Sequence, residues 1–316
     1  MYVPFITPKL QTLARRKGGG GGGRGGGGSS SSGGESGGTS SGSGSKGSSG
    51  GSTGGTAGRT SSVPLSGSSA SGKSSATSYG AGGGKSITIP SGQLFSGRTA
   101  GGGTRQQVVG TRTYGSGYPG ISGRGVTGRG FPFWFWPVIW GGAGAGSGAY
   151  LVDREYGDST NTSRVGGPMV EATFVSNSTN TTFHLLSDNS TVSSLLTSID
   201  SNCSSSLSSS SSTSPVPFNQ SASGVPKPEQ AVQYYRASSV VLTLDGYNNS
   251  ATLSNDTSAP DSPLPSGIDT TLLDCLNQTI LQAAPLVDGA GMRWSAPSSA
   301  GLVGLVWVMW CLSSLI

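Results

Sequence analysis

Nine asparagines of this 316-residue chain stand in the pattern Asn-x-Ser/Thr, the acceptor sequence for N-linked glycosylation. The first 160 residues contain no asparagine, residues 161–277 contain ten, and proline never occupies the middle position. Serine and threonine make up roughly a third of that stretch, so chance would give about three or four such sites. The excess predicts a segment exposed to the glycosylation machinery of the endoplasmic reticulum. The predicted acceptors are Asn161, Asn177, Asn180, Asn189, Asn202, Asn219, Asn248, Asn255 and Asn277.

The three cysteines give a second indication of compartment. Cys311 lies in the apolar C-terminal tail, and removal of that tail would leave Cys203 and Cys275 as an even pair. An even pair is expected of an extracellular domain that closes one disulfide, so we predict this bridge. Two buried free thiols are the alternative. Zinc is disfavoured, because His184 is the single histidine and no Cys-x-x-Cys occurs.

The chain ends in AGLVGLVWVMWCLSSLI, residues 300–316, without a charge. A glycosylphosphatidylinositol signal consists of small residues, a spacer of about 8–12 residues and an apolar tail of about 10–20. Attachment at Gly289, or at Asp288, satisfies this arithmetic, so residues 288–316 are predicted to be such a signal. The alternatives are a C-terminal membrane-spanning helix, which would be of marginal length and without a basic flank, and a buried core helix.

Entry into the secretory pathway requires a leader, and residues 1–16 are atypical for one. Pro4, Pro8 and Lys9 interrupt any apolar run in MYVPFITPKLQTLARRK. A start codon assigned downstream of the true one, unconventional export and a cytosolic, tail-anchored protein are the three explanations, and we favour the first.

Other residue types suited to chemistry are sparse. His184 falls on an expected strand and no Gly-x-Ser-x-Gly elbow precedes a helix in the expected domain, so a structural histidine is favoured over a hydrolase triad. The acids Asp188, Glu229, Asp245 and Asp274 are isolated in sequence and are expected to be solvated. Asp153, Glu155 and Asp158 lack the spacing of a calcium loop. We predict no enzyme activity, no metal and no cofactor.

The charges divide the chain. Up to Tyr150 it holds 14 Lys or Arg against one acid, and beyond that point 5 against 13. Residues 17–130 are rich in Gly and Ser and show no apolar periodicity, which predicts a disordered basic arm. Anionic wall polymers or lipid headgroups are its expected partners. Nucleic acid is disfavoured, because RNA-binding segments of the Arg-Gly type carry more arginines and aromatics.

The arm is followed by FPFWFWPVIW, residues 131–140, and the Gly-rich hinge that completes the segment 131–150. Pro132 and Pro137 exclude a regular helix here. Six aromatics in ten residues suit insertion at a membrane interface, stacking on sugar faces or packing against the following domain. Packing is the favoured interpretation.

Residues 151–287 are the expected folded domain. Two strands are predicted at 169–175 and 181–186, followed by a helix over 192–199 with Ser190 or Thr191 as its N-cap. A Ser/Pro-rich loop, 204–228, leads to a helix that opens at Pro228, a strand at 240–244 on which residues 250–253 pair back after a turn, and a last helix capped by Asp269. These elements predict a small α+β domain, with an antiparallel sheet covered on one face by two to three helices.

Three stretches carry a family resemblance: FPFWFWPVIWGG, PEQAVQYYRASSVVLTLDGYNN and DTTLLDCLNQTI, in that order after a Gly/Ser arm. The chain from about Arg98 onward resembles uncharacterised Gly/Ser-rich surface proteins of basidiomycete-type fungi. The resemblance implies a surface location and no activity. Such proteins begin with a signal peptide just before the Arg-Arg-Gly-rich run, and this chain departs from them there.

The sequence as a whole favours a noncatalytic glycoprotein of the cell surface or wall, anchored at its C-terminus. Two alternatives stay open. One is a cytosolic tail-anchored protein whose basic arm binds RNA or lipid, and the other is a carbohydrate-binding or carbohydrate-active surface domain.

Overall fold

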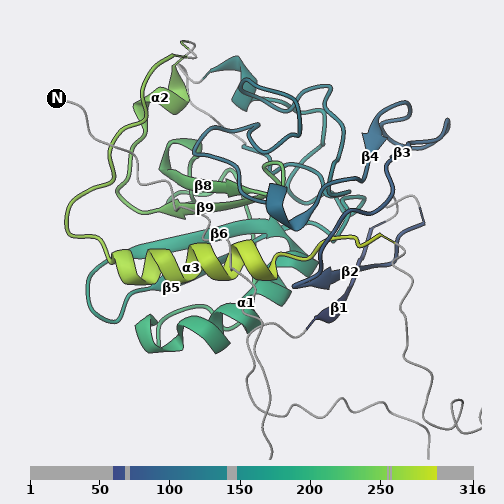
Figure 1. Ribbon diagram of the computed structural model, residues 1–316. Helices are drawn as coiled ribbons and strands as arrows, with labels where there is room; N and C mark the ends of the chain where they lie inside the picture. Colours follow the sequence, from purple (N-terminus) through teal and green to yellow (C-terminus); the bar gives the residue numbers. More distant parts are fainter. Residues whose placement is uncertain (1–59, 68–71, 141–147, 255, 257, 290–316) are drawn as a thin grey trace, which may run out of the picture. The chain divides into compact units, whose positions relative to one another are not determined.

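A five-stranded antiparallel sheet forms the centre of the domain, with the strand order β7-β5-β6-β9-β8 (Figure 1). Its strands are β5 Met169–Val175, β6 Thr182–Asp188, β7 Val216–Pro217, β8 Ala231–Tyr235 and β9 Val240–Leu244. The computed structural model describes residues 60–67, 72–140, 148–254, 256 and 258–289, all within the unit Thr53–Ile316. The α+β class predicted from the sequence is confirmed.

The β5–β6 hairpin follows directly from alternating side chains. Phe174 pairs with Phe183 and Ala172 with Leu185, and these four residues are buried on one face. The residues between them, such as Thr173 opposite His184, are only half-buried. The period of two expected for a strand therefore sets both the register and the buried face. The predicted hairpin is confirmed.

Two long helices cover the face that holds Phe174 and Phe183 (Figure 1). They are α1, Asn189–Cys203, and α3, Thr270–Ala283. The predicted cap of the last helix is confirmed, because the Asp269 carboxylate accepts the Leu272 N–H at 2.9 Å. The helix α1 begins earlier than predicted. Its N-cap is Asp188, which accepts the Thr191 N–H at 2.9 Å and so replaces Ser190 or Thr191 in that role.

A layer without regular helices, which we call the coil layer and which comprises the described residues from 60 to 140, packs against the sheet near its C-terminal end and against α1 and α3 near its beginning. It contains four short strands, β1 Ser61–Pro64, β2 Ser75–Ser78, β3 Ile87–Thr88 and β4 Thr99–Ala100. Its attachment to the sheet is direct. The Ile139 N–H donates to the Met169 sulfur at 3.4 Å, and the Trp140 indole N–H donates to the Tyr234 hydroxyl at 3.0 Å.

The coil layer corrects the prediction of a disordered arm over 17–130, which is wrong for the described residues from 60 onward. Residues 17–59 lie outside the described residues. The prediction failed because order here does not come from a periodic face. It comes from side chains of the aromatic segment 131–140, whose aromatic and aliphatic members are at most 4 % exposed, packed between coil and sheet. The predicted packing of that segment is confirmed.

Glycine is what allows the coil to approach these rings. A Cβ placed on Gly103 would lie 2.6 Å from the Phe133 ring, closer than real Cβ contacts. Further along, the rings of Phe95, Phe131, Trp136 and Tyr156 form one cluster, with centroids 4.8–6.4 Å apart. The low-complexity sequence thus supplies backbone that fits closely around an aromatic core.

The arginines of the expected arm hold the coil layer to the rest of the domain. Every arginine between residues 98 and 129 donates to at least one backbone carbonyl: Arg98, Arg105, Arg112, Arg124 and Arg129. Two of them bind carbonyls at helix C-termini, where cations are favoured. Arg105 reaches Leu281 and Ala284 at the end of α3, and Arg124 reaches the end of the short helix α2, Ser250–Leu253.

Arg105 provides a first stability test. Its Nη1 donates to the Ala284 oxygen at 2.7 Å and the Leu281 oxygen at 3.1 Å, while Nε donates to the Gly80 oxygen at 2.9 Å. Burial lowers its pKa to about 10. A lysine ammonium does not reproduce this fork, so Arg105→Lys is expected to lower the free energy of unfolding by about 2 kcal/mol. Urea unfolding measures the change.

The matched control is Arg154→Lys, since the exposed Arg154 side chain forms no hydrogen bond or ion pair with another described residue. The control is expected to leave stability within about 0.5 kcal/mol of the parent. Equal losses in both variants would contradict the structural role of Arg105.

Three further expectations are settled by the structure. Residues 231–235 are strand β8 and not helix, and residues 250–253 are the helix α2 and not strand. Within the Ser/Pro loop, Ser211 and Ser212 side chains accept the N–H groups of Val175 and Thr173, so part of the loop covers the β5 edge. Residues 141–147 of the hinge lie outside the described residues, and 149–151 form a 3-10 turn.

Candidate functional site

The predicted glycan acceptors divide by exposure. Glycosylation joins the sugar to the asparagine side-chain nitrogen, so an occupied site must project from the folded surface. Six of the predicted acceptors are exposed: Asn177, Asn180, Asn189, Asn202, Asn219 and Asn248. Asn161 and Asn277 are partly buried, and Asn255 lies outside the described residues.

The asparagine outside the acceptor pattern behaves differently. Asn249 is fully buried, and its side chain makes two structural bonds. Nδ2 donates to the Asp261 carboxylate at 2.7 Å, and Oδ1 accepts the Ser262 N–H at 3.0 Å. Within the described residues, therefore, the asparagine that the fold needs inside is the one that lacks the acceptor sequence.

The two partly buried acceptors are also engaged in the fold. The Asn161 Nδ2 donates to the Tyr156 oxygen at 3.3 Å. On α3, the Asn277 Oδ1 accepts the hydroxyl of the buried Tyr235. Side-chain bonds alone do not separate the two groups, because the exposed Asn177 and Asn202 also donate through Nδ2. Partial burial leaves less room for a glycan at Asn161 and Asn277, so both are poorer acceptors than the six exposed residues.

The predicted disulfide between Cys203 and Cys275 is confirmed by geometry. The Cα atoms lie 5.9 Å apart, and the bond joins the end of α1 to the middle of α3. Buried Leu195 and Ile199 of α1 and Leu272 and Leu276 of α3 already place the helices side by side. The bridge closes a loop with a sequence separation of 72 residues.

Removing the bridge by Cys203→Ala with Cys275→Ala is expected to lower the free energy of unfolding by about 4 kcal/mol, because the unfolded chain regains the entropy of a long open loop. Alanine is chosen since Cys203 is fully buried. Urea unfolding with and without dithiothreitol is the measurement. Reductant should destabilise the parent and leave the double variant unchanged, and a parent insensitive to reductant would contradict the expectation.

The predicted lipid-attachment residues are the last two described residues of the chain. The Asp288 Oδ1 accepts the Gly82 N–H at 2.7 Å, and the Gly289 N–H donates to the Gly82 oxygen at 3.2 Å. Leu286 forms an antiparallel bridge with Thr77. Residues 290–316, which include the spacer, the apolar tail and Cys311, lie outside the described residues. No helix within the described ranges is both long and apolar enough to cross a bilayer.

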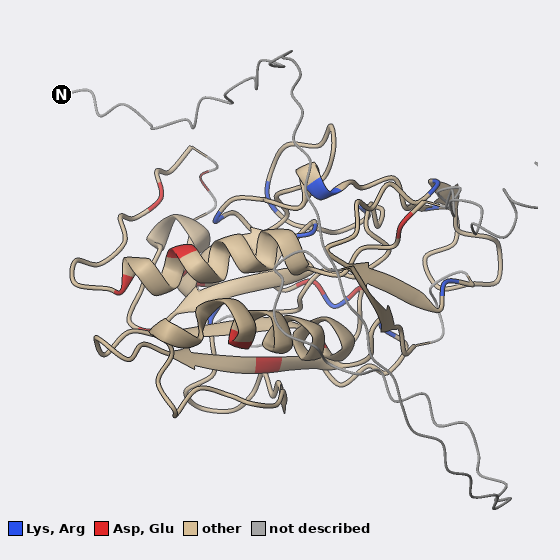
Figure 2. Cartoon of the chain, turned by 60° about the horizontal axis from the view of Figure 1, so that its bottom comes forward, with Lys and Arg blue, Asp and Glu red and all other residues tan. Residues whose placement is uncertain are grey.

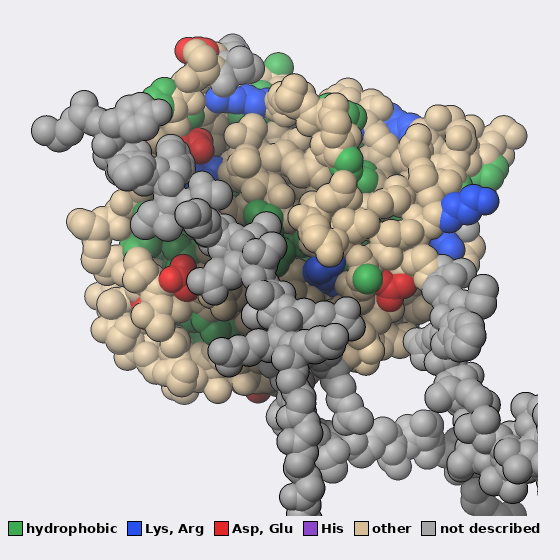
Figure 3. All heavy atoms as spheres, in the orientation of Figure 1, with side chains coloured by type: hydrophobic (Ala, Val, Ile, Leu, Met, Phe, Trp, Pro, Cys, Tyr) green, Lys and Arg blue, Asp and Glu red, His purple; other side chains and the backbone are tan. Residues whose placement is uncertain are grey.

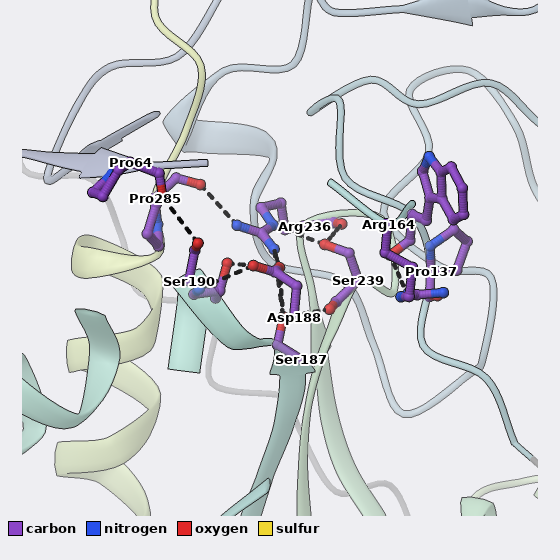
Figure 4. Close-up of polar contacts among 11 residues, drawn as sticks. Pro64, Pro137, Arg164, Ser187, Asp188, Ser190, Arg236, Ser239 and Pro285 are labelled. Carbon is purple, nitrogen blue, oxygen red and sulfur yellow. Dashed lines mark hydrogen bonds and ion pairs between the residues drawn. The ribbon is translucent and has the colours of Figure 1, made fainter. Parts of the chain in front are cut away.

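A buried ion pair lies where the helix, sheet and coil layers meet (Figure 4). The Arg236 Nη2 and the Asp188 Oδ2 are 2.8 Å apart, with side-chain exposures of 0 % and 4 %. Arg236 also donates to the Pro285 oxygen at 2.9 Å and to the Ser239 hydroxyl at 2.7 Å. Burial lowers the pKa of Arg236 to about 10, while Asp188 opposes that shift. The expectation that Asp188 is a solvated acid is wrong.

Arg236 occupies an unusual backbone conformation. Together with Ala237 and Ser238 it forms three successive non-glycine residues at positive φ, of 50°, 48° and 57°, in the turn between β8 and β9. Its guanidinium lies 3.4 Å from the centre of the Phe135 ring. The charge pair and the ring contact offset the cost of that backbone. The residues of this turn carry no glycine or asparagine that would have predicted it.

His184 lies between a hydroxyl and a carboxylate, as the histidine of a hydrolase Ser-His-Asp triad does. Its Nδ1 lies 3.2 Å from the Thr173 hydroxyl and its Nε2 lies 3.2 Å from the Asp245 carboxylate. Glu171 stands on the same sheet face, and its carboxylate would oppose a developing oxyanion. The Thr173 N–H is already bonded to the Ser212 hydroxyl. The geometry gives no support to hydrolysis, and a structural histidine stays our prediction.

The acids after the hinge are engaged by the coil layer. Glu155 forms an ion pair with Arg98 and accepts the Gly128 N–H at 3.0 Å, and Asp153 accepts the Thr127 hydroxyl at 2.9 Å. Within the described ranges no group of three or more His, Cys, Asp or Glu is placed to hold a metal ion.

Charge is spread thinly over the surface. Helices α1 and α3 carry one acid each and no Lys or Arg, and the basic residues concentrate on the coil layer (Figure 2). On the face shown in Figure 3, uncharged polar side chains and backbone dominate. The sequence prediction missed that the arginines point inward to carbonyls, since such contacts leave no periodic signal.

Comparisons of the chain with family models, with curated proteins and with solved structures found no match.

Proposed function

We propose that this chain is a noncatalytic glycoprotein of the cell surface or wall, N-glycosylated on its exposed asparagines and held at the membrane by a C-terminal lipid anchor. The observation that carries the proposal is the division of asparagines by exposure. Six acceptors are exposed, whereas Asn249, which has no acceptor sequence, is fully buried. Passage through a glycosylating compartment accounts for that division. A glycan added to an asparagine that must be buried would prevent the domain from folding, so such an asparagine is expected to lack the acceptor sequence.

The disulfide supports the same compartment. Structural disulfides persist in secreted and surface proteins and are rare in the cytosol. Cys203 and Cys275 are bridged, and the third cysteine lies in the segment that lipid attachment at Gly289 or Asp288 would remove. Gly289 is bonded to Gly82 within the domain, so a lipid there would attach directly to the domain.

The basic residues before residue 60 remain candidates for contact with anionic wall polymers or lipid headgroups. They include Arg15, Arg16, Lys17 and Arg24. The described arginines from 98 to 129 contribute less to such contacts than their number indicates, because each of them donates to backbone carbonyls within the domain. We propose no nucleic-acid partner.

Two enzymes applied to expressing cells test the proposal. An N-glycanase is expected to increase gel mobility by the mass of several glycans, and a phosphatidylinositol-specific phospholipase is expected to release the protein into the medium. A glycanase shift without release would replace the lipid anchor with a spanning tail. An unchanged mobility would overturn the glycoprotein assignment and favour the cytosolic alternative.

A matched pair of variants sharpens the test. Asn177→Gln removes one exposed acceptor and is expected to increase mobility by one glycan. Ser178→Ala changes the exposed middle residue of the same acceptor and keeps Asn177-x-Thr179, so it is expected to leave the number of glycans unchanged. A mobility shift of one glycan in the second variant would contradict the assignment.

A further inference from the structure

A cleft of about 360 Å³ opens in the coil layer, between β4 and the loop that carries Tyr118. Its volume falls within the range of about 300–1,000 Å³ that small-molecule sites occupy. The lining comes entirely from residues 86–132, the part of the chain that contains no asparagine. None of the predicted glycan acceptors therefore belongs to the lining.

The floor of the cleft is glycine backbone. A Cβ on Gly101 would lie 2.9 Å from the Lys85 oxygen, and one on Gly103 would lie 2.6 Å from the Phe133 ring. Between them Gly102 is exposed, and its nearest neighbour would be the Ser86 Cβ at 3.6 Å. Side chains are therefore excluded at Gly101 and Gly103, and the floor is open to solvent at Gly102.

One side of the cleft is apolar and exposed. Pro119 and Ile121 are both exposed, and Ile121 keeps 49 % of its surface accessible. Pro132 continues this wall and is half-buried. Such residues present flat or branched hydrocarbon surface to a ligand without offering a charge.

The other lining groups are uncharged and polar. The Ser86 and Thr99 hydroxyls and the Tyr118 hydroxyl have no hydrogen-bond partner among the described residues. The Gln107 amide oxygen accepts the Thr104 N–H, which leaves its nitrogen for a ligand. Burial raises the pKa of Tyr118, so its hydroxyl stays protonated and can donate. Among the described residues, no Lys, Arg, His, Asp or Glu lines the cleft.

We propose that this cleft binds one or two residues of a neutral oligosaccharide. A sugar ring presents hydroxyls at its edge and C–H groups on its face, which matches converging alcohol and amide groups beside an apolar wall. An anionic sugar would find no counter-charge in the lining. The proposal is independent of the proposed anchor and glycosylation, because it rests on residues that take no part in either.

The test uses the full-length protein, purified, and four neutral probes: laminarihexaose, cellohexaose, chitohexaose and mannohexaose. Isothermal titration calorimetry and saturation-transfer NMR measure binding. At least one probe is expected to bind with a Kd of about 0.1–1 mM, as befits a small, solvent-open site. A hexamer of galacturonic acid, which is anionic, is expected to bind at least tenfold more weakly than that probe.

A double variant, Ser86→Ala with Thr99→Val, removes two hydroxyls while keeping size, and is expected to weaken binding of that probe about tenfold. The matched control is Ser193→Ala with Thr197→Val. These residues line a second hydroxyl-rich groove, of about 450 Å³, between β1 and α1. The control is expected to bind like the parent, with melting temperatures used to show that both variants fold.

Three outcomes would overturn the proposal. The first is the absence of binding by all four neutral probes. The second is equal binding by the Ser86/Thr99 variant and the parent, which would place the sugar elsewhere. The third is tighter binding of a proline-rich decapeptide than of any probe, which would make the cleft a peptide site.

Discussion

Gly166→Ala is expected to lower the free energy of unfolding by about 4 kcal/mol or more and to reduce the yield of folded protein sharply. A Cβ at this position would lie 1.8 Å from the Asp188 Oδ1, and the backbone φ is +88°. The new methyl group can be placed only if the carboxylate moves away from Arg236. The variant therefore adds the strain of a left-handed alanine to the loss of a buried charge partner.

Gly246→Ala separates the two contributions. Its φ is +75°, and no atom lies within 4 Å of the point where an alanine Cβ would stand. An alanine at this position has the same unfavourable left-handed backbone but no steric clash, so the control is expected to lower the free energy of unfolding by about 1 kcal/mol. Urea unfolding of both variants gives the comparison. If the two lost the same amount, the close approach of Gly166 to Asp188 would not exist in the folded protein.

Asp188→Asn is expected to lower the free energy of unfolding by about 3 to 5 kcal/mol, although the substitution keeps the size and the capping ability of the side chain. The amide can still accept the Thr191 N–H. It cannot neutralise Arg236, whose side chain is fully buried and whose remaining partners are neutral oxygens. Because the substitution creates an Asn-Asn-Ser acceptor at 188–190, and the control below an Asn-Thr-Thr acceptor at 269–271, the proteins are made in a host without N-glycosylation. The loss, measured by urea unfolding, thus reports an unpaired buried guanidinium.

Asp269→Asn is the matched control, since Asp269 caps α3 as Asp188 caps α1. Its described contacts are hydroxyls and backbone N–H groups, with no cation among them. It is expected to lose about 1 kcal/mol. Adding Arg236→Met to Asp188→Asn should restore part of the stability, because the orphaned charge is removed. A double variant less stable than the sum of the single losses would contradict the ion pair.

Where apolar periodicity exists, the sequence was a good guide. The alternation in β5 and β6 predicted the hairpin, and Leu272, Leu276 and Ile280 at helical spacing predicted α3 after Asp269. The parity of the cysteines predicted their pairing. In each case the local sequence pattern favours the same element or pairing that the tertiary structure contains.

The failures have tertiary causes. Ala231–Tyr235 follows Pro228 and Glu229, which suit the start of a helix, yet it pairs with β9 because its Val232 and Tyr235 are buried there. The sequence of the coil layer shows no apolar periodicity from which its structure could be predicted. Its order comes from glycine backbone, arginine-to-carbonyl bonds and the aromatic segment 131–140. The cleft in that layer is assembled from several separate turns between residues 86 and 132, so no sequence motif predicted it.

The way the chain leaves the domain has a mechanical consequence. A pull applied through an anchor at Gly289 would act first on the bonds of Gly82 to Gly289 and Asp288, and then on the backbone bonds that Gly84 and Thr77 make to the preceding residues 287 and 286. These would open one after another, and the load would then pass into α3. There Cys275 transmits it covalently to Cys203 on α1. Tension at the anchor can therefore detach only the residues that follow Cys275. Beyond them the load is carried by the disulfide, a covalent bond that thermal forces do not break.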